Sequence, residues 1–237
     1  MIITAEIGSH WKGDFELLEA ILVHCKKIGF DYVKFQSMKA DKIARHPELE
    51  YYEKSSISPE NIKKVDEICK RVGIEWYCTP TYVEAIDFLN PYVNIFKIAV
   101  SDSENEELKD KIFSTGKKVI ISTQRPFKHE DKRIINLYCI PRYPTPYKDV
   151  NFDLLRYFDG YSCHTPDFRA VLNAAYVGID YLEIHITPGK EIFFLDNPVS
   201  FSITECYDLV RYVRIIEDWR NSSSSINIEP VPKKSIS

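Results

Sequence analysis

Short apolar segments alternate with helix-like segments along the whole chain, and this alternation constrains the fold more than any other feature. The apolar segments are rich in Val, Ile, Tyr and Phe, as is typical of buried strands. Their expected ranges are 2–7, 32–36, 74–78, 93–99, 118–122, 134–140, 160–164 and 181–186. Strands that alternate with helices form parallel sheets, and eight such units predict an α/β fold, a (β/α)8 TIM barrel.

Apolar stripes with helical spacing lie between these strands. They predict helices over 14–28, 58–72, 83–89, 106–114, 153–158 and 169–177, and a last helix that opens with a capping box at Ser202 and Glu205. Residues 124–133 have room for barely two turns and carry Pro126, so the helix between strands five and six should be reduced or missing. We expect one barrel domain over 1–220 and a disordered Ser- and Pro-rich tail over 221–237.

Composition and charge exclude several classes of partner. The 31 basic and 35 acidic residues are interspersed, so no basic patch for nucleic acid is expected. No apolar run approaches the roughly 20 residues of a membrane span, and the N-terminus lacks the basic region of a signal peptide. The six cysteines form no C-x-x-C pair, as expected of reduced core thiols. We therefore expect a cytoplasmic protein with no nucleic-acid and no membrane partner.

Two lysines stand inside apolar runs, Lys34 in YVKFQ and Lys97 in NIFKIAV. A buried lysine is costly unless an anion meets it. A lone lysine near a strand end usually reaches solvent, but two of them with hydroxyls from other strands fit a phosphate or carboxylate site better. The pattern therefore favours an anion-binding site.

Polar residues occupy the C-terminal ends of the expected strands, where the active sites of such barrels lie. Because side chains alternate along a strand, pairs two residues apart point to one side together. The residues at these ends are Glu6, Lys34, Gln36, Thr79, Lys97, Ser122, Thr123, Tyr143, Ser162, His164, Glu183 and His185. We expect them to converge on one cavity.

Two of these residues, His164 and His185, end neighbouring strands. A single strand histidine is more often a hydrogen-bonded core residue, but a pair of neutral imidazoles suits a borderline divalent metal with water or substrate at the open positions. Two ligands are fewer than the three of a typical catalytic zinc site, so a structural role stays open. Glu6 is open to two readings as well, a carboxylate paired to a lysine or a general base.

The strand ends and the loops after them carry a set of motifs that resembles the sialic acid synthase family, the N-acetylneuraminate synthases with their pseudaminic and legionaminic acid relatives. Each motif alone is weak evidence, but they follow the family's order across residues 1 to about 217. The motifs are AEIGSHWKGD (5–14), VKFQS (33–37), TPTY (79–82), FKIAVSD (96–102), VIISTQ (119–124), YPTPYKDVN (143–151), GYSCHT (160–165) and LEIHIT (182–187).

The resemblance implies that phosphoenolpyruvate condenses with an N-acyl hexose aldehyde, with release of a nine-carbon acid and phosphate, and usually with a manganese-type divalent ion. It also implies roles for individual residues. Those that would hold phosphoenolpyruvate are Lys34, Thr79, Lys97, Ser122 and Ser162, and those that would contact the sugar are Gln36, Asp102, Tyr143 and Asp196. His164 and His185 would bind the metal, and Glu6 would lie close to the reacting carbons. A homodimer is expected.

The sequence departs from the family pattern mainly around the sugar. The strand-four lysine is followed by Val100, Ser101 and Asp102, where the family usually has a further hydroxyl and a glutamate. The segment after strand eight reads PGKEIFFLDNPVS, and Asp196 matches the family position only by its spacing along the chain. We also expect no C-terminal antifreeze-like domain. Two alternatives stay open, condensation with a different aldehyde and a catalytically silent binding paralogue.

Overall fold

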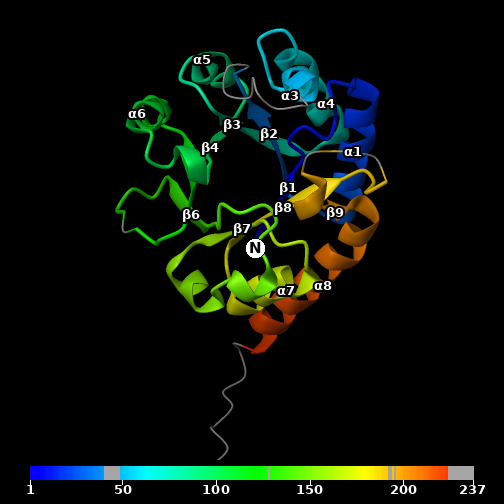
Figure 1. The fold of residues 1–237 in the computed structure, drawn as a ribbon, viewed down its shortest axis with the longest axis vertical. Helices are drawn as coiled ribbons and strands as arrows, with labels where there is room; N and C mark the ends of the chain where they lie inside the picture. The colour runs from blue at the N-terminus through cyan, green and yellow to red at the C-terminus, as the bar shows by residue number, and fades with distance from the viewer. Residues whose placement is uncertain (40–48, 128, 192–193, 195, 224–237) are drawn as a thin grey trace, which may run out of the picture.

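The chain forms a closed barrel of eight parallel strands in a computed structural model that describes residues 1–39, 49–127, 129–191, 194 and 196–223 (Figure 1). Strands pair in chain order, and β1 also pairs with β8, which closes the barrel and confirms the predicted fold. The strands are β1 (Ile2–Glu6), β2 (Tyr32–Ser37), β3 (Glu75–Pro80), β4 (Ile95–Ile98), β5 (Lys118–Thr123), β6 (Ile134–Tyr138), β7 (Gly160–Cys163) and β8 (Tyr181–Thr187).

Helices surround the strands on the outside of the barrel (Figure 1). The α-helices are α1 (Phe15–Ile28), α3 (Leu49–Ser55), α4 (Ile62–Val72), α5 (Ala85–Leu89), α6 (Glu106–Ser114), α7 (Phe168–Val177) and α8 (Ile203–Ser223). Short 3-10 helices are η1 (Val100–Asp102), η2 (Tyr147–Asp149), η3 (Phe152–Tyr157) and η4 (Asn197–Val199), and a two-residue strand β9 (Phe201–Ser202) pairs with β8. The last helix, α8, packs against both α1 and α7.

Local sequence signals explain where two of the helices begin. The Asp14 side chain accepts the N–H groups of Glu16 and Leu17 at the start of α1. Helix α8 opens with a reciprocal capping box, because the Glu205 carboxylate accepts the Ser202 N–H at 2.7 Å and the Ser202 hydroxyl accepts the Glu205 N–H at 3.2 Å. The capping box predicted for the last helix is therefore confirmed.

Three helix boundaries differ from the expectation. The second helix begins at Ile62 rather than at residue 58, because the Asn61 side chain accepts the Ser58 N–H and holds the preceding residues in a turn. The segment expected as a helix over 153–158 is instead a 3-10 helix over Phe152–Tyr157, since the chain has only a few residues there before β7 begins at Gly160. Helix α8 continues through Ser223 into the expected tail, and residues 224–237 lie outside the described residues.

The connection from β5 to β6 lacks a helix in the residues described there, all but residue 128, which agrees with the predicted reduction. Helix α3 was not predicted. All six cysteines of the chain are free and buried. Among the helices in the described part of the chain, none has the length and apolarity needed to cross a bilayer.

The interior of the barrel is built in two layers. Alternate residues of each strand point inward, so on β4 both Ile95 and Lys97 face the barrel axis. The lower layer is a small apolar cluster of Tyr77, Ile95, Ile120, Ile135 and Leu137. The upper layer is polar, and it lies at the C-terminal ends of the strands.

Candidate active site

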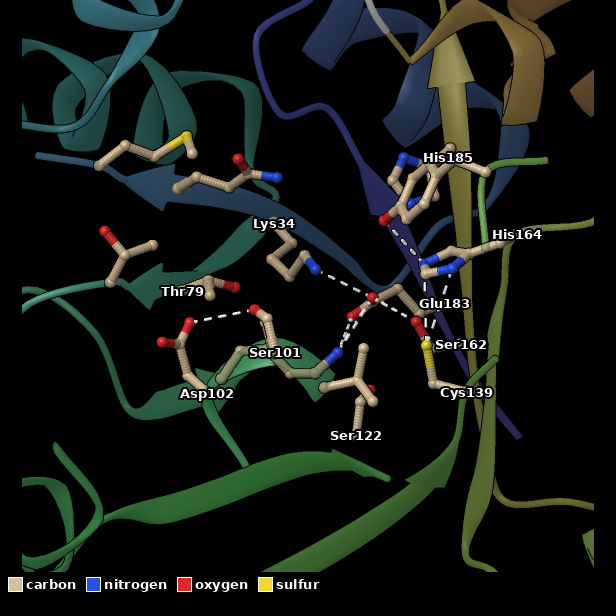
Figure 2. Close-up of a pocket in the computed structure, with 17 residues that line it drawn as sticks. Lys34, Thr79, Ser101, Asp102, Ser122, Cys139, Ser162, His164, Glu183 and His185 are labelled. Carbon is tan, nitrogen blue, oxygen red and sulfur yellow. Dashed lines mark hydrogen bonds and ion pairs between the residues drawn. The ribbon is translucent and has the colours of Figure 1, made fainter. Parts of the chain in front are cut away.

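A cavity of about 190 Å³, here called the inner cavity, opens at the C-terminal ends of the strands (Figure 2). The predicted site residues that line it are Lys34, Gln36, Thr79, Lys97, Asp102, Ser122, Tyr143, Ser162, His164 and His185. The two remaining predicted residues lie next to it, with Glu6 against Lys34 and Asp196 in a neighbouring cavity. The convergence of strand ends expected from the sequence is therefore present, except that Thr123 lines a different cavity.

Glu183 lines the inner cavity and forms ion pairs with both Lys34 and Lys97, and Figure 2 shows it beside Lys34. The Lys97 ammonium donates to both of its carboxylate oxygens at 3.0 Å, and the Lys34 ammonium donates to Oε1 at 2.9 Å. Ser162 donates to the same carboxylate at 2.9 Å and Tyr77 at 3.2 Å. Ser162, expected to hold substrate, is thus engaged by a protein carboxylate.

A second carboxylate, Glu6, lies 2.8 Å from the Lys34 ammonium and accepts a hydrogen bond from the Gln36 amide at 2.8 Å. Strand pairing places Glu6 directly opposite Lys34. Gly8 has a φ of +50°, and a Cβ there would lie 3.0 Å from Glu6 Oε1. The glycine of the AEIG motif thus leaves room for the carboxylate, which in this structure is paired with a lysine.

Burial and charge act in opposite directions on this network. Burial disfavours ionisation of Glu183, but the adjacent Lys34 and Lys97 outweigh it and hold the pKa of that carboxyl well below its usual range. Burial lowers the pKa of Lys34 to about 8, and the attraction of Glu183 opposes this effect. An ammonium has three N–H groups; Glu183 engages one on Lys34 and two on Lys97, and Glu6 lies 2.8 Å from Lys34 and takes a second one there. Each lysine keeps at least one N–H for a further anion.

Two buried hydroxyls complete this end of the cavity. Thr79 and Ser122 are 4% and 1% exposed, and their oxygens have no hydrogen-bond partner among the described residues (Figure 2). Buried polar groups are nearly always satisfied, so these hydroxyls require a partner from water or from a ligand. Together with the free lysine N–H groups, they form a set of donors suited to a small polyanion.

The histidine pair stands at the rim of the inner cavity, with ring centroids 5.3 Å apart. His164 Nδ1 lies 2.8 Å from the Ile140 carbonyl, to which it donates, and its Nε2 accepts the Tyr143 hydroxyl at 2.8 Å. Burial lowers the pKa of His164 to about 4, and burial followed by the neighbouring His164 lowers the pKa of His185 well below its usual value. Both imidazoles are therefore neutral at physiological pH.

Neutral imidazoles are the form that binds metals, and a backbone carbonyl that fixes the tautomer of His164 is typical of metal ligands. His185 Nδ1 is buried and has no hydrogen-bond partner among the described residues. The described residues contain no cluster of three or more His, Cys, Asp or Glu ligands. The donor set fits a divalent ion that takes its other ligands from water or substrate.

A second cavity of about 450 Å³, here called the outer cavity, lies beside the first and shares Gln36, Met38 and Tyr143 with it. Its remaining lining residues are Tyr52, Asp196, Pro198 and Val199. The Asp196 carboxylate lies 4.0 Å from His185 Nδ1. The predicted sugar residues thus divide between the cavities, since Asp102 lines only the inner one and Asp196 only the outer one.

Sequence reasoning missed several residues that line the two cavities. Glu183 is predicted only as a strand end. Two signals point to a role in the site: it lies two residues before His185 on the same strand, and the two buried lysines need an anion. Cys139 lines the inner cavity with its sulfur 3.8 Å from the His164 ring nitrogens. Tyr52 lies on α3, a helix that the sequence pattern did not reveal.

Known proteins are similar to this chain in both sequence and fold. An uncharacterised protein of Methanocaldococcus jannaschii is 31% identical over 98% of this chain and 74% of its own length. The N,N'-diacetyllegionaminic acid synthase of Campylobacter jejuni is 27% identical over 91% of this chain and 76% of its own. The crystal structure of N-acetylneuraminic acid synthetase from Leptospira borgpetersenii superposes with a TM-score of 0.83 at 22% identity, covering 98% of this chain and 87% of that one.

The NeuB family matches residues 21–224, most of the chain. The match spans β2 to β8 and therefore all the strands of the barrel except β1. Because the matched segment carries both lysines, both histidines and Glu183, the family assignment and the site geometry concern the same residues. The chain therefore belongs to the NeuB family and is an enzyme of the transferase class.

Proposed function

We propose that this enzyme condenses phosphoenolpyruvate with an N-acyl hexose aldehyde to give a nonulosonic, sialic-type acid and phosphate. The observation that carries the proposal is the anion subsite of the inner cavity. Lys34 and Lys97 each keep a free N–H there, beside the unpartnered hydroxyls of Thr79 and Ser122. Family membership and a synthase relative support the same reaction type.

The charge balance of the site suits a substrate that arrives and leaves as an anion. Two lysines face two carboxylates, Glu6 and Glu183, so the protein alone is close to neutral at this point. Phosphoenolpyruvate adds negative charge on the side of the lysines away from Glu183. Its phosphate and carboxylate would accept the free lysine N–H groups and the two hydroxyls, with Glu183 holding the ammonium groups in position.

In the reaction, the enol carbon of phosphoenolpyruvate bonds to the aldehyde carbon of the sugar, and water adds to C2 of the resulting cation. The tetrahedral adduct then expels phosphate and leaves the keto acid, so one water is consumed for each phosphate released. The Glu6 carboxylate would stabilise the positive charge at C2 or orient the water, and the lysines neutralise the departing phosphate. A manganese-type divalent ion held by His164 and His185 would supply Lewis-acid polarisation of the aldehyde oxygen.

Phosphate release from phosphoenolpyruvate, measured with manganese and a panel of N-acyl hexoses, tests the proposal. We expect release that depends on the sugar and is lost in Lys97→Met, with a nine-carbon acid as coproduct by mass spectrometry. Release with simple aldehydes but with none of the N-acyl hexoses would instead identify a different acceptor. Absence of release with every aldehyde would contradict the proposed condensation. The expected homodimer stays a prediction that sedimentation equilibrium can measure.

A further inference from the structure

The two histidines of the candidate metal site differ in what engages their ring nitrogens. His164 Nδ1 lies 2.8 Å from the Ile140 carbonyl, which can only accept, so Nδ1 carries the proton and Nε2 carries the lone pair. The Tyr143 hydroxyl lies 2.8 Å from Nε2 and donates to it. His185 Nδ1, by contrast, has no hydrogen-bond partner within the described part of the chain. The lone pair of His164 is therefore already taken by a protein donor.

The loop between β6 and η2 carries Tyr143 and is fixed to His164 on both sides of that residue. Before it, the Ile140 carbonyl accepts the His164 Nδ1–H, and after it, the Thr145 N–H donates to the His164 carbonyl at 2.9 Å. The Thr145 hydroxyl also donates to the Arg142 carbonyl at 2.8 Å, across the loop. Because these contacts hold the backbone, Tyr143 can leave His164 only by rotation of its own side chain.

The Tyr143 side chain has room for such a rotation. Its ring centroid lies 4.0 Å from that of His164 and 5.7 Å from that of His185, but the residue is 54% exposed. A ring that is half exposed leaves no buried void when it turns, and side chains of this kind change rotamer readily. Tyr143 lines both the inner and the outer cavity, so a rotated ring still lies at their shared boundary.

A divalent ion and the Tyr143 hydroxyl compete for the same atom. A neutral imidazole has one lone pair, which either accepts a hydrogen bond or binds a metal. The Ile140 carbonyl fixes the proton on Nδ1, so His164 has no second nitrogen to offer. Binding of an ion at His164 thus requires that the hydrogen bond to Tyr143 breaks first.

We propose that Tyr143 caps the metal-binding nitrogen of His164 and is displaced from it when a divalent ion binds. Tyr143 is then a positioning residue whose place depends on the metal, and its release changes the wall that the outer cavity presents to an acceptor. The inference rests on the metal role given to His164 and His185 in the proposed function. It adds that one side chain opposes metal binding and connects the metal to the second cavity.

Calorimetric titration of manganese into wild type, Tyr143→Phe and Tyr157→Phe tests the competition. Tyr143→Phe keeps the ring and removes only the competing hydroxyl, so it should bind manganese about twofold to tenfold more tightly, the weight of one hydrogen bond. Tyr157→Phe, on η3 with a ring that is 69% exposed, should bind as wild type does. A hydroxyl with a supporting or purely structural role gives the opposite sign or no change, and either result in Tyr143→Phe would overturn the inference.

A spectroscopic measurement follows the displacement itself. The near-ultraviolet difference spectrum on addition of manganese should show a tyrosine signal in wild type and in Tyr157→Phe, because a hydroxyl leaves its imidazole acceptor. The signal should be lost in Tyr143→Phe. A wild-type protein that binds manganese with no tyrosine signal would show that Tyr143 stays on His164, against the inference.

Phosphate release from phosphoenolpyruvate is measured in parallel with and without manganese. If wild type binds no manganese and release proceeds without it, the condensation stands and the inference about Tyr143 is overturned. If manganese binds with the expected order of affinities but no aldose supports release, the condensation fails and the competition at His164 stands.

Discussion

The inner and outer cavities are neighbours that share three residues, yet the chain builds them from different parts. The anion subsite of the inner cavity comes from strand residues whose positions follow from barrel register, such as Lys34 on β2, Lys97 on β4 and Glu183 on β8. The outer cavity takes Tyr52 from α3 and Asp196 from the segment beside η4. Loops and added helices vary more readily than barrel strands. The anion subsite is therefore fixed by the register of the barrel strands, whereas the outer cavity depends on segments outside those strands.

The two cavities also differ in how their polar groups are held. Glu183 receives hydrogen bonds from four side chains, and removal of one partner would leave the others charged and buried. Asp196 lies in a loop next to η4, with its carboxylate 4.0 Å from His185 Nδ1. Substitution of Glu183 should therefore affect folding and binding together.

The largest effect is expected for Glu183→Gln. The substitution keeps the shape of the side chain but leaves two buried ammonium groups short of their shared carboxylate, which costs about 3–5 kcal/mol of unfolding free energy in such networks. Urea unfolding measures this loss. The control Glu67→Gln, on the exposed face of α4, should change stability by less than about 0.5 kcal/mol. Similar unfolding midpoints for the two variants would show that the inner network is not a stabilising one.

The histidine pair should give the next largest effect, on metal binding. Loss of one imidazole in His164→Ala or His185→Ala should weaken manganese binding at least as much as loss of an outer-shell partner does, about 10- to 100-fold. Calorimetric titration measures the affinity, and circular dichroism checks the fold. His24→Ala removes an exposed imidazole on α1 and serves as the matched control. If both site variants bind manganese as tightly as the wild type does, the two histidines have a structural role.

A smaller effect should appear in the pH dependence of phosphoenolpyruvate binding. Burial lowers the pKa of Lys34 to about 8, so the ammonium that attracts the anion is present below that pH and is lost as pH rises through it. Affinity should therefore fall about fourfold between pH 7 and pH 8.5. The dependence should be absent in Lys34→Met, even though that variant binds more weakly at every pH. A wild-type affinity that does not change with pH would show that deprotonation of Lys34 does not control phosphoenolpyruvate binding.

The sequence predicts the strand-built part of the molecule well, because two signals agree there. Apolar runs mark the strands, and period-two alternation then places Lys97 above Ile95 and His185 above Glu183 on the inner face. The sequence could not show that both lysines share one carboxylate, since β2, β4 and β8 are not neighbours in the sheet and their side chains meet only inside the closed barrel. It also could not show Tyr52, because α3 carries no apolar stripe that separates it from a loop.

The central claim, that Lys34 and Lys97 form the subsite for phosphoenolpyruvate, is tested most directly by one fluorescence titration. Wild type and Lys97→Met are titrated with phosphoenolpyruvate, with Lys118→Met, an exposed lysine at the start of β5, as the control. We predict a loss of about tenfold to a hundredfold in affinity for Lys97→Met alone, as expected when a charge-assisted contact to a buried anion is removed. Equal affinity in the three proteins would contradict the claim and leave Lys97 as a structural partner of Glu183.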